Sequence, residues 1–271
     1  MNQEVRDIVM NYTLFDDNFW KEVLNDKECV GYVLEQILER DVPLVSSQQE
    51  YPISHDGRRG VKLDILAEDE DKQFYNLEIQ SYTSGSSPIR ARFNGTRIDG
   101  EFSYPGQKWK DMKDIYIIFI CKKDYLKGNQ QVYRFERKDE NGNPLDDGIH
   151  IIYVNGEMES DTPPGRVVHD FYCNGFENMN EGPLKEKAKF LKTSEEEVNR
   201  MCEAVERYVI KKVEEAKAEA NKRLEVEKAK VKAAEAEKIN CIKNMFKAGA
   251  TIEMISQGFS ITPEAVQSLI I

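Results

Sequence analysis

Two carboxylates and a carboxamide stand among apolar residues in the stretch LDILAEDEDKQFYNLEIQ, which covers residues 63–80. The acidic residues in its middle predict a β-hairpin turn, with apolar-rich strands on either side. If the turn is centred near Asp71, Asp64 and Glu78 are directly opposed across the strands. Their Cβ atoms would then be about 4.5–5.5 Å apart. The spacing therefore predicts two carboxylates that project from one face of the hairpin.

Strand alternation extends this polar face to Asn76 and Gln80, which are each two residues from Glu78. The opposite face is expected to carry Leu63, Ile65, Leu77 and Ile79. Like charges held so close repel each other, and a divalent cation relieves the repulsion. Carboxylate oxygens suit Mg²⁺ or Mn²⁺, and a metal-activated water beside a phosphodiester makes a hydrolase site. A hairpin with one solvated face shows the same alternation, and spacing alone favours that second interpretation.

The segments around the hairpin indicate an α/β fold. DKECVGYVLEQILER has apolar residues at helical spacing and Asp26 available as N-cap. PIRARFNGTRIDGEF should begin a helix, with Ser87 as N-cap and Pro88 in its first turn. The uninterrupted apolar run DIYIIFIC is typical of a central strand buried on both faces. Helix, hairpin, helix and buried strand in this order predict a layered α/β structure.

Composition limits the class of protein. The chain has 271 residues and a formal net charge of -11. This charge excludes a protein coated with basic residues, although it leaves room for a local basic cleft. Five widely spaced cysteines without a CxxC pair predict reduced thiols, and no apolar run is long enough to span a membrane. We therefore expect a cytoplasmic protein without a membrane segment.

The composition changes near Pro183. Residues 183–238 are rich in Glu, Lys and Ala and predict a long charged helix, while residues 239–271 predict a small helical tail. Apolar residues such as Val209 and Leu224 recur at roughly heptad steps, which fits a dimerising coiled coil and a solvated single helix equally. A homo-oligomer formed through this helix is thus one of two expectations. The domain expected before it covers residues 1–182.

Several segments together resemble a known family. LDILAEDEDKQFYNLEIQ is followed by PIRARFNGTRID, DIYIIFIC, VYRF and IHIIYVN in one order. From about Phe15 to Glu157 the sequence resembles the PD-(D/E)XK nuclease family transposases, in the Rpn-like recombination-promoting nuclease group. The resemblance implies a restriction-endonuclease-like core with a central mixed sheet flanked by helices. It also implies Mg²⁺-dependent cleavage of DNA.

The resemblance assigns roles to residues of the hairpin. Asp64 and Glu78 match the acidic residues of the motif and would ligate the metal, together with the backbone carbonyl of Ile79. Gln80 stands where many nucleases of the wider superfamily carry lysine, and a glutamine can orient water but supplies no positive charge. Leu63 replaces the proline that names the motif. We therefore expect Asp64, Glu78 and Gln80 to form the catalytic group.

Arginines are the expected partners of the DNA backbone. Arg90 and Arg97 are seven residues apart on one face of the predicted helix, and Arg58 lies in the turn before the hairpin. The resemblance also implies an accessory acid on an upstream helix that assists the metal, and Glu35 is the nearest candidate. These residues predict a Mg²⁺-dependent or Mn²⁺-dependent DNA endonuclease. The alternative is a nuclease fold with weakened chemistry that binds DNA or protein.

Overall fold

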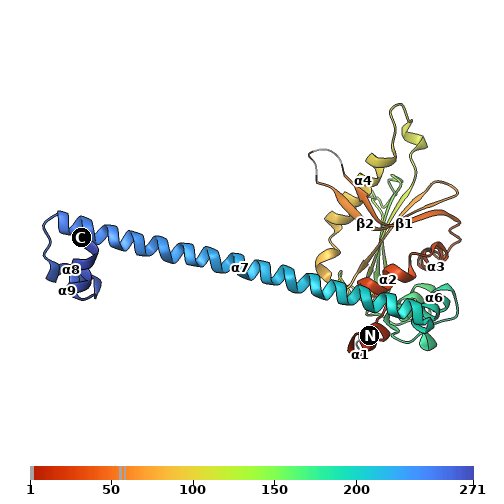
Figure 1. Cartoon of the computed structure of the whole chain (residues 1–271). Helices are drawn as coiled ribbons and strands as arrows, with labels where there is room; N and C mark the ends of the chain where they lie inside the picture. The colour runs from red at the N-terminus through yellow and green to blue at the C-terminus, as the bar shows by residue number, and fades with distance from the viewer. Residues whose placement is uncertain (1–2, 55–56, 58) are drawn as a thin grey trace. The chain divides into compact units, whose positions relative to one another are not determined.

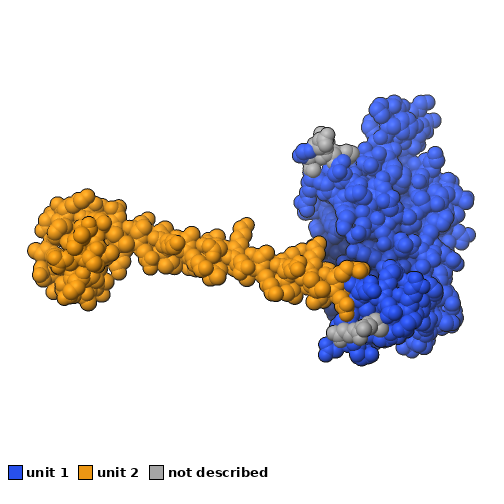
Figure 2. Space-filling model, viewed as in Figure 1, with its two compact units in different colours: residues 1–205 blue, residues 206–271 orange. Residues whose placement is uncertain are grey.

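The computed structural model describes residues 3–54, 57 and 59–271. The chain divides into two compact units, residues 1–205 and 206–271 (Figure 2). The first unit extends past the boundary expected at residue 183, because α6 (Pro183–Thr193) and the first turns of α7 (Glu195–Lys247) contribute buried side chains to its core. Leu184, Leu191 and Val198 are among these side chains.

A six-stranded mixed sheet forms the centre of the first unit, in the order β1-β2-β3-β4-β6-β5. β3, β4 and β6 are parallel, whereas β1, β2 and β5 run antiparallel to their neighbours. The strands are β1 (Leu44–Ile53), β2 (Val61–Asp69), β3 (Phe74–Gln80), β4 (Ile115–Cys121), β5 (Val132–Phe135) and β6 (Ile149–Asn155). The predicted hairpin is therefore confirmed as β2 and β3, and the predicted central strand as β4.

Helices cover both faces of this sheet (Figure 1). One face packs against side chains of α2, α3, α5, α6 and the start of α7, and the other packs against α4. The helices of this unit are α1 (Gln3–Met10), α2 (Asp17–Val23), α3 (Lys27–Leu38), α4 (Pro88–Phe102), α5 (Pro163–Tyr172) and α6 (Pro183–Thr193), with the 3-10 turns η1 (Thr83–Gly85), η2 (Trp109–Asp111) and η3 (Phe176–Asn178). The predicted mixed sheet flanked by helices is confirmed.

Helix caps occur where the sequence predicts them. The Asp26 carboxylate accepts a hydrogen bond from the Glu28 N–H at 3.0 Å at the start of α3. Ser87 caps α4 in the same way, through the Ile89 N–H at 3.2 Å, and Pro88 occupies the first turn. Each cap satisfies a backbone donor that has no partner inside its helix. The cap at Ser87 fixes where α4 starts relative to the end of β3.

The second unit consists of most of α7 (Glu195–Lys247) with α8 (Ile252–Phe259) and α9 (Pro263–Ile270). Ile242, Ile255 and Val266 form its small core. The exposed part of α7 carries ion pairs between residues three or four apart, which support a solvated helix.

Among the described residues, no helix combines the length and the apolar character that a membrane span requires.

Candidate active site

The site lies where the main-chain ladder between β2 and β3 stops. Ile65 pairs with Leu77, and Asp64 and Glu78 are the next residues on the two strands. The Ile79 N–H donates to Asp64 Oδ2 at 3.1 Å, and the Asp64 N–H donates to Glu78 Oε1 at 3.4 Å. Each carboxylate thus accepts a hydrogen bond from the backbone of the opposite strand. We call Asp64 and Glu78 the carboxylate pair.

Alternation along β2 breaks at this point. The sequence predicted Leu63 on the same face as Ile65, but the two side chains belong to different hydrophobic clusters. Leu63 is buried with Ile53 in the cluster on the α4 side, so its predicted face is wrong. The neighbouring strand is also irregular there, since Glu50 of β1 has a positive φ of 49°. A local change in strand twist therefore accompanies the site.

Amide groups surround the carboxylate of Glu78, whose side chain is fully buried. Its Oε1 accepts hydrogen bonds from Asn76 Nδ2 at 2.9 Å and from Asn94 Nδ2 at 3.2 Å. Asn94 comes from α4 and also donates to Asn76 Oδ1 at 2.9 Å. Both amides are completely buried. These donors replace part of the hydration that the carboxylate loses on burial.

Arg90 supplies the positive charge beside this carboxylate. Its Nη2 pairs with Glu78 Oε2, and its Nη1 donates to the Gly85 carbonyl at 3.0 Å. Burial raises the pKa of Glu78 above its ordinary value, the charge of Asp64 raises it further, and Arg90 opposes both. Burial likewise raises the pKa of Asp64, against Arg90 and the Ile79 N–H. The site therefore holds two carboxyl groups that attract protons or cations strongly.

Gln80 lies against the turn that follows β3. A Cβ added to Gly85 would lie only 1.7 Å from Gln80 Oε1 and 3.2 Å from Arg90 Nη1. An alanine at position 85 would therefore displace the Gln80 carboxamide. The backbone carbonyl of Gln80 accepts a hydrogen bond from the Lys122 N–H at 2.9 Å, which ties the end of β3 to the end of β4. The carboxamide is thus held next to the Arg90 guanidinium.

The structure places the other predicted residues elsewhere. Arg97 is buried, donates to the Arg59 carbonyl and lies over the Phe93 ring, with its guanidinium carbon 5.3 Å from the ring centroid. Arg58 lies outside the described residues. Glu35 on α3 accepts a hydrogen bond from the Val42 N–H at 3.4 Å, and no described contact links it to the carboxylate pair. Of the predicted arginines that the structure describes, Arg90 is the one that joins the pair.

Two charged residues of α2 act on the site and were missed by the sequence analysis. The charge of Asp17 raises the pKa of Asp64, and that of Lys21 lowers it. Lys21 Nζ lies 3.7 Å from Asp17 Oδ2 and 3.2 Å from Glu50 Oε1 on β1. The sequence pattern that could have identified Asp17 and Lys21 is their spacing of four residues on a short amphipathic segment. The same segment contains Phe19 and Trp20, which are buried.

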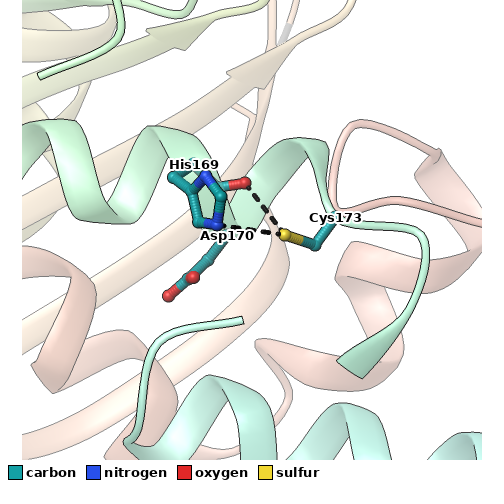
Figure 3. Close-up of side chains that lie close together, drawn as sticks. All are labelled: His169, Asp170 and Cys173. Carbon is teal, nitrogen blue, oxygen red and sulfur yellow. Dashed lines mark hydrogen bonds between the residues drawn. The ribbon is translucent and has the colours of Figure 1, made fainter. Parts of the chain in front are cut away.

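A second group of polar side chains lies at the end of α5. His169, Asp170 and Cys173 each offer a ligand atom, and these atoms lie within 4.8 Å of one another (Figure 3). Local hydrogen bonds already engage all three. His169 Nε2 lies 2.9 Å from the Asn178 carbonyl oxygen, Asp170 Oδ1 accepts from the Asn180 N–H at 2.8 Å, and the Cys173 thiol donates to the His169 carbonyl at 3.4 Å. These bonds hold the segment after α5 in place, and they explain why the three side chains lie together.

Comparison with known proteins agrees with this arrangement. A sequence model of the family described as PD-(D/E)XK nuclease family transposase matches residues 15–243, from the segment before α2 to the last turns of α7. No curated protein and no solved structure matches the chain. The family match covers most of the sequence and includes the carboxylate pair with the sheet that positions it. The chain belongs to the PD-(D/E)XK nuclease family transposases.

Proposed function

We propose that the chain is a metal-dependent DNA endonuclease whose site is the carboxylate pair, Asp64 and Glu78. The observation that carries the proposal is that these two carboxylates come together at the end of one hairpin, each bonded to the backbone of the other strand. Membership of a nuclease family supports hydrolysis of a phosphodiester, with DNA as the substrate.

The residues present fit a hard divalent cation. Glu78 is fully buried and has one cationic partner, while Asp64 adds a second negative charge beside it. In a strand, the N–H and C=O of one residue point to the same side, so the Ile79 carbonyl faces β2 as its N–H does. Two carboxylates and a carbonyl are ligands that Mg²⁺ or Mn²⁺ prefers. When bound, the cation would acidify a water molecule and neutralise phosphate charge.

The chain's own residues take separate tasks in this proposal. Asp64, Glu78 and the Ile79 carbonyl hold the cation. Arg90 positions Glu78 through its ion pair and places a positive charge where a phosphate would approach. Gln80, held against Gly85, orients a water molecule through its carboxamide.

The accessory acid in this proposal is Asp17 rather than Glu35, since the charge of Asp17 raises the pKa of Asp64 whereas Glu35 accepts a hydrogen bond from the Val42 N–H. Arg97 binds the Arg59 carbonyl and thereby shapes the turn before β2. Its engagement in that turn favours a positioning role over direct contact with phosphate.

The test is metal-dependent cutting of plasmid DNA by the full chain. Asp64→Asn and Glu78→Gln keep the side-chain shapes but remove the charges, and each is expected to abolish cutting with Mg²⁺ or Mn²⁺. Asp71→Asn, in the exposed hairpin turn, is the matched control and should cut like the wild type. Equal cutting by the wild type and both site variants would contradict the proposal.

A catalytically weak DNA-binding module is the second candidate function. Gln80 in place of a lysine favours it, as does the occupation of one Glu78 oxygen by Arg90. This candidate predicts DNA binding that weakens steeply with salt and no metal-dependent cutting under any of the conditions above.

Self-association through α7 is a separate proposal. Val209, Val213, Leu224 and Val231 are each about half exposed on this helix, with relative exposures of 52%, 45%, 53% and 51%. Burial of such a stripe against a second copy would remove apolar area from water. Val213→Glu with Leu224→Glu should then lower the sedimentation coefficient of the full chain, whereas Lys222→Glu, at an exposed polar position away from the stripe, should not. An unchanged coefficient in the double variant would contradict self-association by this route.

A further inference from the structure

An exposed aromatic side chain belongs to the turn whose Gly85 carbonyl binds Arg90, the partner of Glu78. Tyr82 follows Gln80 by two residues and is 80% exposed, and Ile89, next to Arg90 on α4, is 67% exposed. Tyr82 follows Glu78 by four residues, which span at most about 14 Å, the length of about four stacked nucleotides. Tyr82 therefore lies within about four nucleotides of a phosphate held at the carboxylate pair.

The backbone that carries Tyr82 is fixed at several points. The Ser81 hydroxyl donates to the Phe15 carbonyl, and the Gly85 carbonyl accepts from Arg90 Nη1 at 3.0 Å. The Tyr153 hydroxyl donates to the Ser86 carbonyl at 2.9 Å. A tyrosine has few rotatable bonds of its own, so a ring on a fixed backbone loses little conformational entropy when it packs against a ligand.

Two lysines lie at this edge of the sheet, and one of them, Lys123, pairs with Glu157 at 2.8 Å. Lys122 and Lys123 directly follow β4, and the Lys122 N–H bonds to the Gln80 carbonyl of the adjacent β3. Lys122 Nζ lies 5.6 Å from the centroid of the Phe15 ring, on the segment that also anchors Ser81. A basic edge with an exposed aromatic ring is the arrangement that binds single-stranded nucleic acid, because phosphates meet the cations and bases stack on the ring.

We propose that Tyr82 stacks on an unpaired base within about four nucleotides of the phosphate at the carboxylate pair, so that the preferred substrate is DNA that is single-stranded or locally unpaired. In a fully paired duplex both faces of an internal base are covered by its neighbours, which leaves no face for the tyrosine ring. This inference rests on the proposed nuclease function and specifies its substrate.

The experiment measures binding of the full chain to two short DNAs in Ca²⁺, which suits oxygen ligands. Both DNAs carry 2-aminopurine at the same position, unpaired in a bulge in one and fully paired in the other. Tyr82→Ala should weaken binding to the bulged DNA about 5- to 100-fold and abolish the fluorescence change of its 2-aminopurine. Binding to the paired DNA should be unchanged, and Tyr82→Phe should behave as the wild type.

Tyr104→Ala is the matched control, because Tyr104 is 65% exposed and lies beyond the far end of α4, about 22 Å along that helix. The inference is overturned if Tyr82→Ala has no effect, lowers binding of both DNAs equally, or matches the effect of Tyr104→Ala. Failure of the nuclease proposal is seen separately, as cutting that does not depend on the carboxylate pair. Stacking at Tyr82 could still be observed if the nuclease proposal failed, and cutting could still be observed if Tyr82 did not stack.

Discussion

Replacing Arg90 by glutamine should destabilise the metal-free protein, because it leaves the carboxylate of Glu78 buried without its cationic partner. Glu78 has no exposed side-chain surface, whereas Arg90 is 32% exposed, so the pair is buried on the carboxylate side. Removal of one partner from a buried ion pair costs about 3–5 kcal/mol. The amide donors of Asn76 and Asn94 remain, which lowers the expectation to about 2–4 kcal/mol.

The assay is thermal and urea unfolding of the full chain in EDTA. For a unit of this size, about 2–4 kcal/mol corresponds to a fall in Tm of roughly 5–15 °C. Glu78→Gln in the Arg90→Gln background removes the unpaired charge and should restore at least half of the loss. Saturating Mn²⁺ should also restore stability, by about 2.7 kcal/mol at a hundred times its Kd. The same cation should stabilise the wild type less, since Arg90 already occupies one Glu78 oxygen.

Arg92→Gln is the matched control for this prediction. Arg92 is exposed on the same helix, two residues away, and its loss should change stability by less than about 0.5 kcal/mol. An Arg90→Gln variant as stable as the Arg92→Gln variant would refute the reasoning. So would a loss that persists unchanged when Glu78 is neutralised, because the destabilisation would then have another cause.

Three further predictions concern the surroundings of the site and the core. Gly85→Ala should displace the Gln80 carboxamide, costing about 1 kcal/mol and lowering cutting, whereas Gly100→Ala, with open space around it, should leave cutting intact in a plasmid assay. Lys192→Met should cost about 2–4 kcal/mol in urea unfolding, since three carbonyls lose their donor, while the exposed Lys189→Met should cost little. In EDTA the protein should lose stability as the pH rises above 3.8 and 4.5, the ordinary pKa values of the Asp and Glu carboxyl groups. The pKa values of the carboxylate pair are raised in the folded state, so over this range the folded protein still binds protons that the unfolded chain has released. Mn²⁺ affinity, measured by calorimetry, should rise over the same range, and a loss of stability on acidification through it would contradict the pKa directions.

The register of the hairpin could be predicted from the sequence because two local rules fix it. A polar turn near Asp71 and a period of two together set Asp64 opposite Glu78, and neither rule needs tertiary information. The caps at Asp26 and Ser87 follow from equally local chemistry. The face of Leu63 could not be predicted in this way, because alternation breaks between Leu63 and Ile65, where the neighbouring strand has Glu50 with a positive φ.

Local sequence rules also could not predict which helix approaches the carboxylate pair. Glu35 and Asp17 both stand on helices upstream of the hairpin, and only the packing of α2 and α3 on the sheet decides which one reaches Asp64. Arg90 and Arg97 share a helix face, yet seven residues separate them by about 10 Å along the axis. Because of that distance, Arg90 pairs with the Glu78 carboxylate whereas Arg97 donates to the Arg59 backbone carbonyl.

The bonds between the carboxylate pair and the opposite backbones mean that the site is also the last rung of the β2–β3 hairpin. Both acids therefore have a structural task at the end of the hairpin in addition to the proposed catalytic one. An intact pair in a sequence indicates how the sheet ends as much as it indicates activity. Residues without such a second task, such as the carboxamide of Gln80, would be free to change first and are the better markers of whether cleavage persists.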